Sequence, residues 1–327
     1  MAVLVTGATG FVGSWLVREL LKRGEEVRVL HRPSSSLEEL QGLNFVSRLG
    51  DVTDLDSLRD AVIGVDTVFH LAGVVGYSRA MRRLMEDVNV GGTKKVLEAM
   101  QQTPRPKLVY MSSVVAVGAS YDRTVLNENS PFNVHSLDLG YFETKKAAED
   151  LVLDACRRGR VEAVILNPST IYGAGDAKKG SRKTQVKVAQ GKFPFYTTGG
   201  VSIVSVHDVV AAILRAREAG RIGERYILSG DNITIEALFK KIAAIAGVKS
   251  PSIHLPNLVV RAIGKVGDGL EAVGKKGPIN TENAWTSTLF HWFDHTKARR
   301  ELGFKPRPAD EALRESVEWM REHGYLN

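Results

Sequence analysis

The chain has 327 residues, of which 43% are hydrophobic and 25% are charged, and its formal net charge is +7. This length suits one large α/β domain with a smaller one, and the composition is that of an ordinary soluble globular protein. The single cysteine, Cys156, excludes an internal disulfide. No apolar stretch approaches the roughly 20 residues of a membrane span. We therefore expect a cytoplasmic protein with no membrane partner.

The basic residues are spread along the chain in short pairs such as Arg82-Arg83 and Arg299-Arg300. A nucleic-acid-binding protein usually concentrates such residues on one helix or face, often with aromatic residues between them. We therefore expect no nucleic-acid partner, and we identify no set of metal ligands. The sequence leaves a homodimer open.

The first residues form a strand, a glycine turn and a helix in that order. Residues 2–6 read as a short apolar strand, and an amphipathic helix follows the turn and stops at Gly24. Backbone can approach phosphates closely at glycine, and the helix N-terminus attracts their charge. The turn therefore predicts a dinucleotide site, with an ordinary tight turn as the alternative. The expected contacts are Gly7, Thr9, Gly10, Phe11, Val12 and Gly13.

The second strand, EEVRVL, ends without the acidic residue that usually bonds the ribose of NAD. His31 and Arg32 stand there instead, followed by Ser34 to Ser36. A guanidinium suits the dianion of a 2′-phosphate. We therefore predict NADP(H) in preference to NAD(H), with contacts from His31, Arg32 and Ser35. A solvated surface arginine is the alternative.

The later strand ends add residues to the same expected site. Small residues end the strand VDTVFHLAG and permit close approach of a cofactor. His70 in that strand is expected to point into the fold. Asn89 is expected to anchor backbone or bound water, a role compatible with capping a helix that begins near it. The expected cofactor contacts here are Asp51, Val52, Leu71, Ala72, Gly73, Asn89, Met111, Pro168 and Ser169.

Tyr141 and Lys145 are four residues apart in GYFETKKAAEDLV, so they share one face of a predicted helix. A free phenol has a pKa of about 10, and a nearby ammonium favours the phenolate and lowers that pKa. The pair predicts a proton donor for a carbonyl, with an amphipathic surface pair as the alternative. Ser112 and Ser113 end the strand KLVYMSS, where a hydroxyl can bond a substrate oxygen.

These residues resemble one family over nearly the whole chain. TGATGFVG, GDVTD, HLAG, NVGGT, VYMSS, YFETK and NPSTIYGAGD occur in the order seen in extended short-chain dehydrogenases/reductases, the NAD-dependent epimerase/dehydratase family. Within it, the chain resembles the dihydroflavonol-4-reductase-like branch. The resemblance implies that Tyr141 donates and accepts the proton, that Lys145 bonds the nicotinamide ribose, and that Ser113 positions the substrate oxygen. Tyr141 and Lys145 then also contact the cofactor.

We expect an α/β fold with a Rossmann-type doubly wound parallel sheet and a smaller C-terminal substrate-binding domain. The nucleotide-binding domain is expected at 1–167, with 201–230 returning to it, and the substrate cap and C-terminal helices at 168–200 and 231–327. The expected substrate contacts are Val75, Ser112, Ser113, Tyr141 and Tyr172. An aromatic set could line an apolar pocket or equally pack the small domain: Trp285, Phe290, Trp292 and Phe293.

Sugar-nucleotide epimerases often carry an arginine for the substrate diphosphate before the last helix of the nucleotide domain. Val201 stands at that position here, so a diphosphate would lose its bidentate partner. We therefore predict an NADPH-dependent oxidoreductase that reduces a ketone or aldehyde to an alcohol. The alternative is a nucleotide-sugar epimerase or dehydratase, with replacement charge from Lys178, Lys179 and Arg182. A non-catalytic NADP-sensing protein is a third alternative. The presence of both Tyr141 and Lys145 disfavours it, because such proteins typically lack the tyrosine or the lysine.

Overall fold

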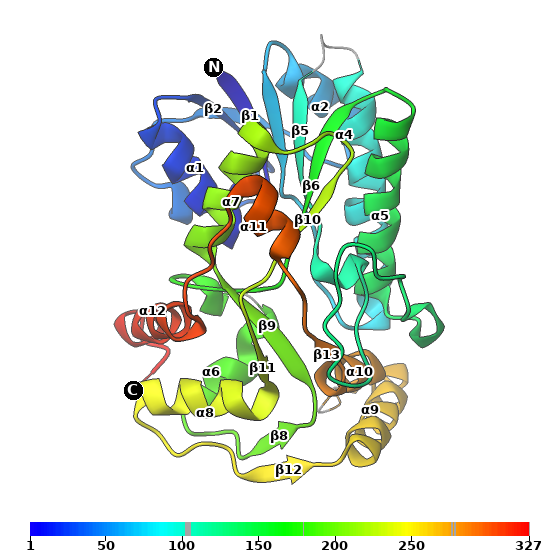
Figure 1. The fold of residues 1–327 in the computed structure, drawn as a ribbon, viewed down its shortest axis with the longest axis vertical. Helices are drawn as coiled ribbons and strands as arrows, with labels where there is room; N and C mark the ends of the chain where they lie inside the picture. Colours follow the sequence, from blue (N-terminus) through cyan, green and yellow to red (C-terminus); the bar gives the residue numbers. More distant parts are fainter. Residues whose placement is uncertain (102–105, 179, 276, 278, 327) are drawn as a thin grey trace.

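A computed structural model describes residues 1–101, 106–178, 180–275, 277 and 279–326. A large sheet with helices on both faces occupies one half of the molecule, and smaller sheets with their own helices occupy the other (Figure 1). Within the described residues, no helix combines the length and the apolar character needed to cross a membrane.

The large sheet has seven parallel strands in the order β10-β6-β5-β4-β1-β2-β3. Its strands are β1 (Ala2–Thr6), β2 (Glu26–His31), β3 (Val46–Leu49), β4 (Thr67–His70), β5 (Lys107–Met111), β6 (Glu162–Pro168) and β10 (Arg225–Leu228). The strand order reverses direction between β1 and β4, and open α/β sheets bind ligands at the carboxyl ends of the strands on either side of such a point. This topology confirms the predicted Rossmann-type doubly wound sheet.

Helices cover both faces of the large sheet, each over its own apolar core (Figure 1). One face carries α1 (Phe11–Lys22), α7 (Val206–Ala219) and α11 (Thr296–Leu302), and the other carries α2 (Leu55–Val62), α4 (Thr93–Met100) and α5 (Gly140–Arg157). Both faces of the strands are therefore buried, which explains why β1, β4 and β6 read as continuous apolar runs rather than alternating ones.

The smaller half is built around β9, which pairs with β7, β11 and β13. The strands are β7 (Thr170–Tyr172), β9 (Gly200–Ser205), β11 (Asp231–Thr234) and β13 (Phe290–His291), with a separate pair β8 (Phe195–Thr197) and β12 (Ile253–Leu255). The helices are α6 (Lys183–Ala189), α8 (Ile235–Ala246), α9 (Asn257–Ala272), α10 (Thr281–Thr288) and α12 (Ala309–Glu322). Of the segment 201–230, expected to return to the nucleotide domain, α7 and β10 lie with the large sheet. β9 instead belongs to the small sheet, because its neighbours in register are β7, β11 and β13.

Local signals explain where several elements begin and end. The Thr234 hydroxyl accepts a hydrogen bond from the Ala237 N–H at 3.1 Å and so caps the start of α8, and α8 ends at Gly247 with φ +76°. The helical segment around Asn89 begins earlier than predicted. It starts with α3 (Arg82–Met85), continues as a π-helical turn η3 (Glu86–Gly92), and only then becomes α4. Asn89 therefore lies inside the π-helical turn and does not cap a helix. The 3₁₀ turns are η1 (Glu38–Leu40), η2 (Arg79–Met81), η4 (Val114–Ala116), η5 (His135–Leu137), η6 (Asp176–Lys178) and η7 (Gly180–Arg182).

Helices α9 and α10 pack closely at the end of the small half through a glycine face (Figure 1). A Cβ added at Gly267 would lie 1.7 Å from the carbonyl oxygen of Ile279, and one at Gly264 would lie 2.8 Å from the Cβ of Ala284. Real atoms cannot approach so closely, so α9 needs glycine at these positions. Gly269 is on the same helix, but a Cβ there meets no atom within 4 Å.

We expect Gly267→Ala to lower the free energy of unfolding by about 1–3 kcal/mol, because backbone must move to admit the methyl group. Gly269→Ala is the matched control, and alanine there should stabilise α9 by up to about 1 kcal/mol through helix propensity. Urea unfolding of both variants checks this. Equal midpoints for the two would contradict the close packing of α9 on the segment before α10.

Candidate active site

The glycine turn after β1 packs backbone against backbone. Gly7 has φ +71°, and a Cβ there would lie 2.6 Å from the amide nitrogen of Ala72 at the end of β4. A Cβ on Gly13 would lie 2.1 Å from the carbonyl oxygen of Gly7. Gly10 is the N-cap of α1 and contributes no side-chain hydrogen bond to the first turn. The turn therefore presents bare backbone and a helix N-terminus at the switch point of the sheet, which fits the pyrophosphate of a dinucleotide.

The other predicted contacts of this part surround the turn. Thr9, Phe11 and Val12 lie within it or in the first turn of α1, and each is partly exposed. Asn89 holds the chain after β4, because its Oδ1 accepts from the Val74 N–H at 2.7 Å and its Nδ2 donates to the Val74 carbonyl at 3.0 Å. The predicted role of Asn89 as a backbone anchor agrees with these contacts. Leu71 and Ala72 lie beside Gly7, and Gly73 lies beside the Asn89 side chain.

The expected adenosine end lies at the carboxyl ends of β2 and β3. Arg32 is 62% exposed, and its Nε lies 3.9 Å from Asp51 Oδ2. The Ser35 N–H donates to the Arg32 carbonyl at 3.0 Å. His31, by contrast, is only 9% exposed, and its Nε2 is 2.7 Å from the Ser47 hydroxyl. The side chain of His31 is thus engaged inside the sheet, while that of Arg32 reaches solvent.

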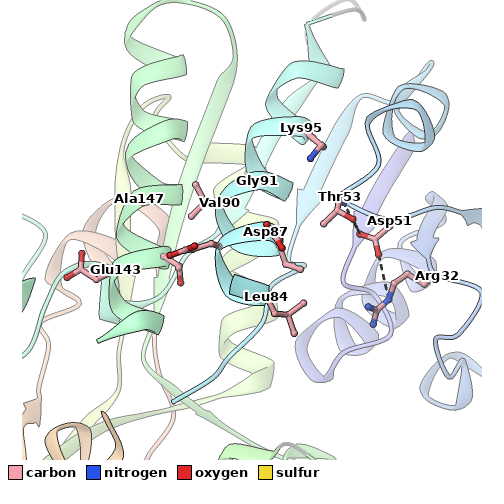
Figure 2. Close-up of a pocket in the computed structure, with 13 residues that line it drawn as sticks. Arg32, Asp51, Thr53, Leu84, Asp87, Val90, Gly91, Lys95, Glu143 and Ala147 are labelled. Carbon is pink, nitrogen blue, oxygen red and sulfur yellow. Dashed lines mark hydrogen bonds and ion pairs between the residues drawn. The ribbon is translucent and has the colours of Figure 1, made fainter. Parts of the chain in front are cut away.

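A groove of ≈ 720 Å³ begins at Arg32 and Asp51 and passes η3 and α4 toward α5, and Figure 2 shows the residues that line it. Its other walls include Thr53, Leu84, Asp87, Val90, Lys95, Glu143 and Ala147. Tyr141, Lys145 and Ser113 do not line this groove. We therefore assign the reacting centre from its side-chain chemistry, and the groove meets the expected cofactor site only at its Arg32 end.

Tyr141 lies in the first turn of α5, where it meets a second tyrosine and an apolar wall. Its ring packs edge-on against Tyr77 with 5.9 Å between centroids, and its hydroxyl is near the side chain of Ser113, whose influence lowers its pKa. Phe132, Leu137 and Trp285 pack with it around one buried cluster. Burial raises the pKa of Tyr141, Tyr77 raises it further, and Ser113 opposes this only in part. The predicted lowering of this pKa by Lys145 is therefore not what the structure shows.

Lys145 explains the difference, because its ammonium is turned toward β5. The side chain is buried, its Nζ donates to the Met111 carbonyl at 2.8 Å, and it lies 5.2 Å from the centre of the Tyr110 ring. Burial lowers the pKa of Lys145 to about 8, while Glu149 opposes the shift. His70, predicted to point inward, is fully buried between Thr6 and Thr93, and burial with the charge of Lys145 lowers its pKa to about 3.

Ser112 and Ser113 are adjacent, and the structure sends their hydroxyls to different partners. Ser113 lies near Tyr141 and its hydroxyl accepts from the Val115 N–H at 3.4 Å, whereas Ser112 is 4% exposed and donates to Glu149 Oε2 at 2.5 Å. Successive residues of an extended chain point to opposite sides, which accounts for the split. The hydroxyl of Ser112, expected to meet substrate, is thus engaged inside the protein. Val75, also expected to meet substrate, is 48% exposed.

Three polar residues behind the site escaped the sequence analysis. Glu149 on α5 is fully buried and contacts Asn167 of β6 and Arg225 of β10, at 2.6 Å and 2.9 Å. Spacing on α5 was the available signal, because Tyr141, Lys145 and Glu149 follow one another at intervals of four and so share one face of the helix.

Part of the expected substrate region is core. Tyr172 is 1% exposed in the small apolar cluster beneath Arg182, whose guanidinium carbon lies 4.0 Å from the ring centre. Ser169 is also buried at 8%, one residue after Pro168 at the end of β6. Among the predicted aromatic residues, Phe290 and Phe293 are core, Trp292 donates to the Ile233 carbonyl, and Trp285 lies in the cluster with Tyr141.

The basic residues suggested as substitutes for a diphosphate-binding arginine are already engaged. Lys178 Nζ lies 3.1 Å from Glu38 and 2.7 Å from Glu39. Arg182 is buried beside Asp176 at 3.6 Å and donates to the Ile171 carbonyl. Lys179 lies outside the described residues.

The NAD dependent epimerase/dehydratase family matches residues 3–229, which include the glycine turn, Ser113, Tyr141 and Lys145. The chain belongs to this family. Members of this extended short-chain dehydrogenase/reductase family are NAD(P)-dependent enzymes, and so is this protein.

Similar proteins extend the match to the whole length. "Sterol demethylase protein B" of Methylococcus capsulatus is 32% identical, with all of both chains covered. "Putative dihydroflavonol 4-reductase" of Synechocystis sp. is 32% identical over 98% of this chain and 95% of that protein. The crystal structure of gox2253 is 35% identical, with a TM-score of 0.89 over 100% of this chain and 99% of that one. The second of these relatives agrees with the predicted dihydroflavonol-4-reductase-like branch of the extended family.

In this extended-family site we expect Gly7→Ala to weaken NADP(H) binding about tenfold or more, because its methyl group would displace the chain at Ala72. Gly24→Ala is the matched control: it has a similar φ of +76° but meets no atom within 4 Å. The control should lose only about 1–2 kcal/mol of stability from the left-handed backbone. Fluorescence titration of folded protein measures the affinities, and normal binding by Gly7→Ala would contradict the assignment of the turn.

Proposed function

We propose that the protein is an NADPH-dependent reductase that converts a ketone or aldehyde to an alcohol. The observation that carries the proposal is Tyr141, a phenol with a raised pKa that lies near Ser113 and packs on an apolar cluster. A raised pKa leaves the phenol protonated at neutral pH, which is the form that a proton donor needs. The presence of both Tyr141 and Lys145 argues against a non-catalytic sensor.

When bound, the reduced nicotinamide supplies a hydride to the carbonyl carbon. Ser113 and Tyr141 bind and orient the carbonyl oxygen through their hydroxyls, and Tyr141 delivers its proton to that oxygen, which gives the alcohol. The phenolate left on Tyr141 gains from the ammonium of Lys145 one helical turn away. Tyr77 and the apolar cluster exclude water around this proton transfer, so the hydrogen bonds within it are strengthened.

The wall beside Tyr141 indicates the substrate class. Phe132, Leu137 and Trp285 are partly exposed and pack on the same apolar cluster as Tyr141, and the guanidinium carbon of Arg261 lies 3.8 Å from the centre of the Trp285 ring. Such a set of apolar and aromatic side chains suits a ring compound. The names of two relatives, "Sterol demethylase protein B" and "Putative dihydroflavonol 4-reductase", also refer to ring compounds. A nucleotide sugar would need a cation for its diphosphate, and Val201, Lys178 and Arg182 do not offer a free one. We therefore propose an apolar ring ketone as substrate.

The deciding measurement separates a co-substrate from a cofactor that is returned at each turnover. Purified protein with excess NADPH and a panel of ring ketones and aldehydes should oxidise one NADPH for each carbonyl reduced. Nucleotide sugars without added cofactor form the second arm. Sugar interconversion without net NADPH change, together with no reaction on any carbonyl, would assign the protein to the epimerases.

Tyr141→Phe should lower turnover on the active ketone about 10²–10⁴-fold, because only the transferable proton is lost. NADPH affinity should change little. Tyr121→Phe is the control, since the Tyr121 ring packs edge-on against Trp285 with 6.2 Å between centroids and is 55% exposed. Near wild-type turnover by Tyr141→Phe would rule out the proposed acid.

Arg32 is proposed to recognise the 2′-phosphate of NADPH. A charge-assisted hydrogen bond contributes about 1.5–3 kcal/mol, so Arg32→Ala should bind NADPH about 10–100-fold more weakly and NADH nearly normally. Arg23→Ala, which removes an arginine paired with Glu218 on α7, should change neither affinity. Calorimetric titration of both cofactors tests this, and an Arg32→Ala protein that keeps its NADPH preference would refute it.

A further inference from the structure

A buried carboxylate lies behind the proposed active site, at the meeting point of α5 with three strands. Glu149 is 0% exposed. Its Oε2 accepts from the Ser112 hydroxyl at 2.5 Å and from Asn167 Nδ2 at 2.6 Å, and its Oε1 accepts from Arg225 Nη1 at 2.9 Å. The carboxylate thus joins the carboxyl ends of β5 and β6 to the start of β10.

The partners of Glu149 reach onward to the site and to a distant loop. Asn167 Nδ2 also donates to the Ser113 carbonyl at 3.0 Å, which fixes the backbone that carries the Ser113 hydroxyl. Arg225 Nε donates to the Glu128 carbonyl at 3.1 Å, and the Glu128 carboxylate accepts from the Ile227 N–H at 2.9 Å. Movement of Glu149 would therefore disturb Ser113 and the loop around Glu128 together.

The surroundings of Lys145 make Glu149 the group that sets its charge. From β5, Tyr110 faces the ammonium, and burial raises the pKa of that phenol, so it is neutral. From β4, His70 is also neutral, since its pKa is lowered to about 3. Tyr141 on α5 is protonated, and the Met111 carbonyl is a dipole. Glu149, one turn further along α5, is the charged group whose field favours the ammonium.

Packing alone does not account for an ion pair at this position. A buried Glu–Arg pair loses the hydration of both charges, and apolar residues of similar volume often serve stability as well or better. The pair here has two further donors on the carboxylate, both from residues next to Ser113 or bonded to its backbone. The hydrogen bonds around Glu149 therefore hold the backbone that carries Ser113.

We propose that Glu149 is a positioning residue, which fixes Ser113 through Ser112 and Asn167 and whose charge holds Lys145 as an ammonium at the site. The inference rests on the proposed function, because Ser113 and Lys145 take their roles from it. Glu149 itself touches neither substrate nor cofactor in this scheme. Its effect passes through Lys145 and through the strand ends that it joins.

The test is the titration of Lys145 in cofactor-free protein, followed by NMR of ¹³C-labelled lysine, with the signal assigned by its loss in Lys145→Arg. The wild-type midpoint should lie at about 8. Glu149→Gln keeps the shape of the side chain and removes its charge, so the midpoint should fall by about one pH unit. Asp150→Asn is the control, because it removes the neighbouring carboxylate, which pairs with Lys146 at the surface.

In Glu149→Gln, the alkaline limb of the kcat/KM profile for ketone reduction should move to lower pH by the same amount as the Lys145 midpoint. In Asp150→Asn it should not move. Should Glu149→Gln fail to fold because Arg225 loses its partner, Glu149→Gln/Arg225→Met carries the same measurement. A folded variant with an unchanged Lys145 midpoint overturns the proposal, whatever its activity. Failure of the proposed function would show differently, as normal turnover by Tyr141→Phe, and the titration does not depend on it.

Discussion

The fold depends on how closely the turn after β1 approaches the end of β4. Gly7 and Gly13 allow backbone atoms to meet where any side chain would intervene, so α1 begins directly at the switch point of the sheet. The strand order on either side follows from that start, with β2 and β3 on one side and β4, β5, β6 and β10 on the other. The chain after β4 is held at Val74 by Asn89 and continues to Tyr77, whose ring packs against Tyr141.

A second constraint is electrostatic and lies on α5. Tyr141, Lys145 and Glu149 occupy one face of this helix at successive turns, and all three are withdrawn from solvent to different degrees. Burial raises the pKa of Tyr141 and lowers the pKa of Lys145, so it favours the neutral form of both. The carboxylate of Glu149 opposes this at Lys145 and favours the ammonium. A donor and a cation can therefore persist side by side at neutral pH. The protonation state of Lys145 thus depends on Glu149 as well as on burial.

Much of the fold could be predicted from sequence because its signals are local. The glycine spacing at Gly7, the apolar strands and the cap at Thr234 each report on a few neighbouring residues. Contacts between distant segments gave no such signal. The partnership of Glu149 with Arg225 spans 76 positions, and the inward turn of Ser112 depends on which face of the chain meets α5. The pKa of Tyr141 was mispredicted for the same reason, since spacing along a helix shows proximity to Lys145 but not the burial that outweighs it.

The loop between β4 and η2 is held at both ends by carboxamides from different halves of the molecule. The Asn89 side chain of the nucleotide half is hydrogen-bonded to the Val74 backbone, while Asn280 and Asn283 of the small half donate to the Tyr77 carbonyl. Only two residues, Val75 and Gly76, separate the two anchor points, so the chain between them has little freedom to move. A shift of the small half relative to the large sheet is therefore transmitted to the Tyr77 ring and to its edge-on contact with Tyr141. Ligand-driven closure of the two halves would in this way be sensed mechanically at the proton donor itself.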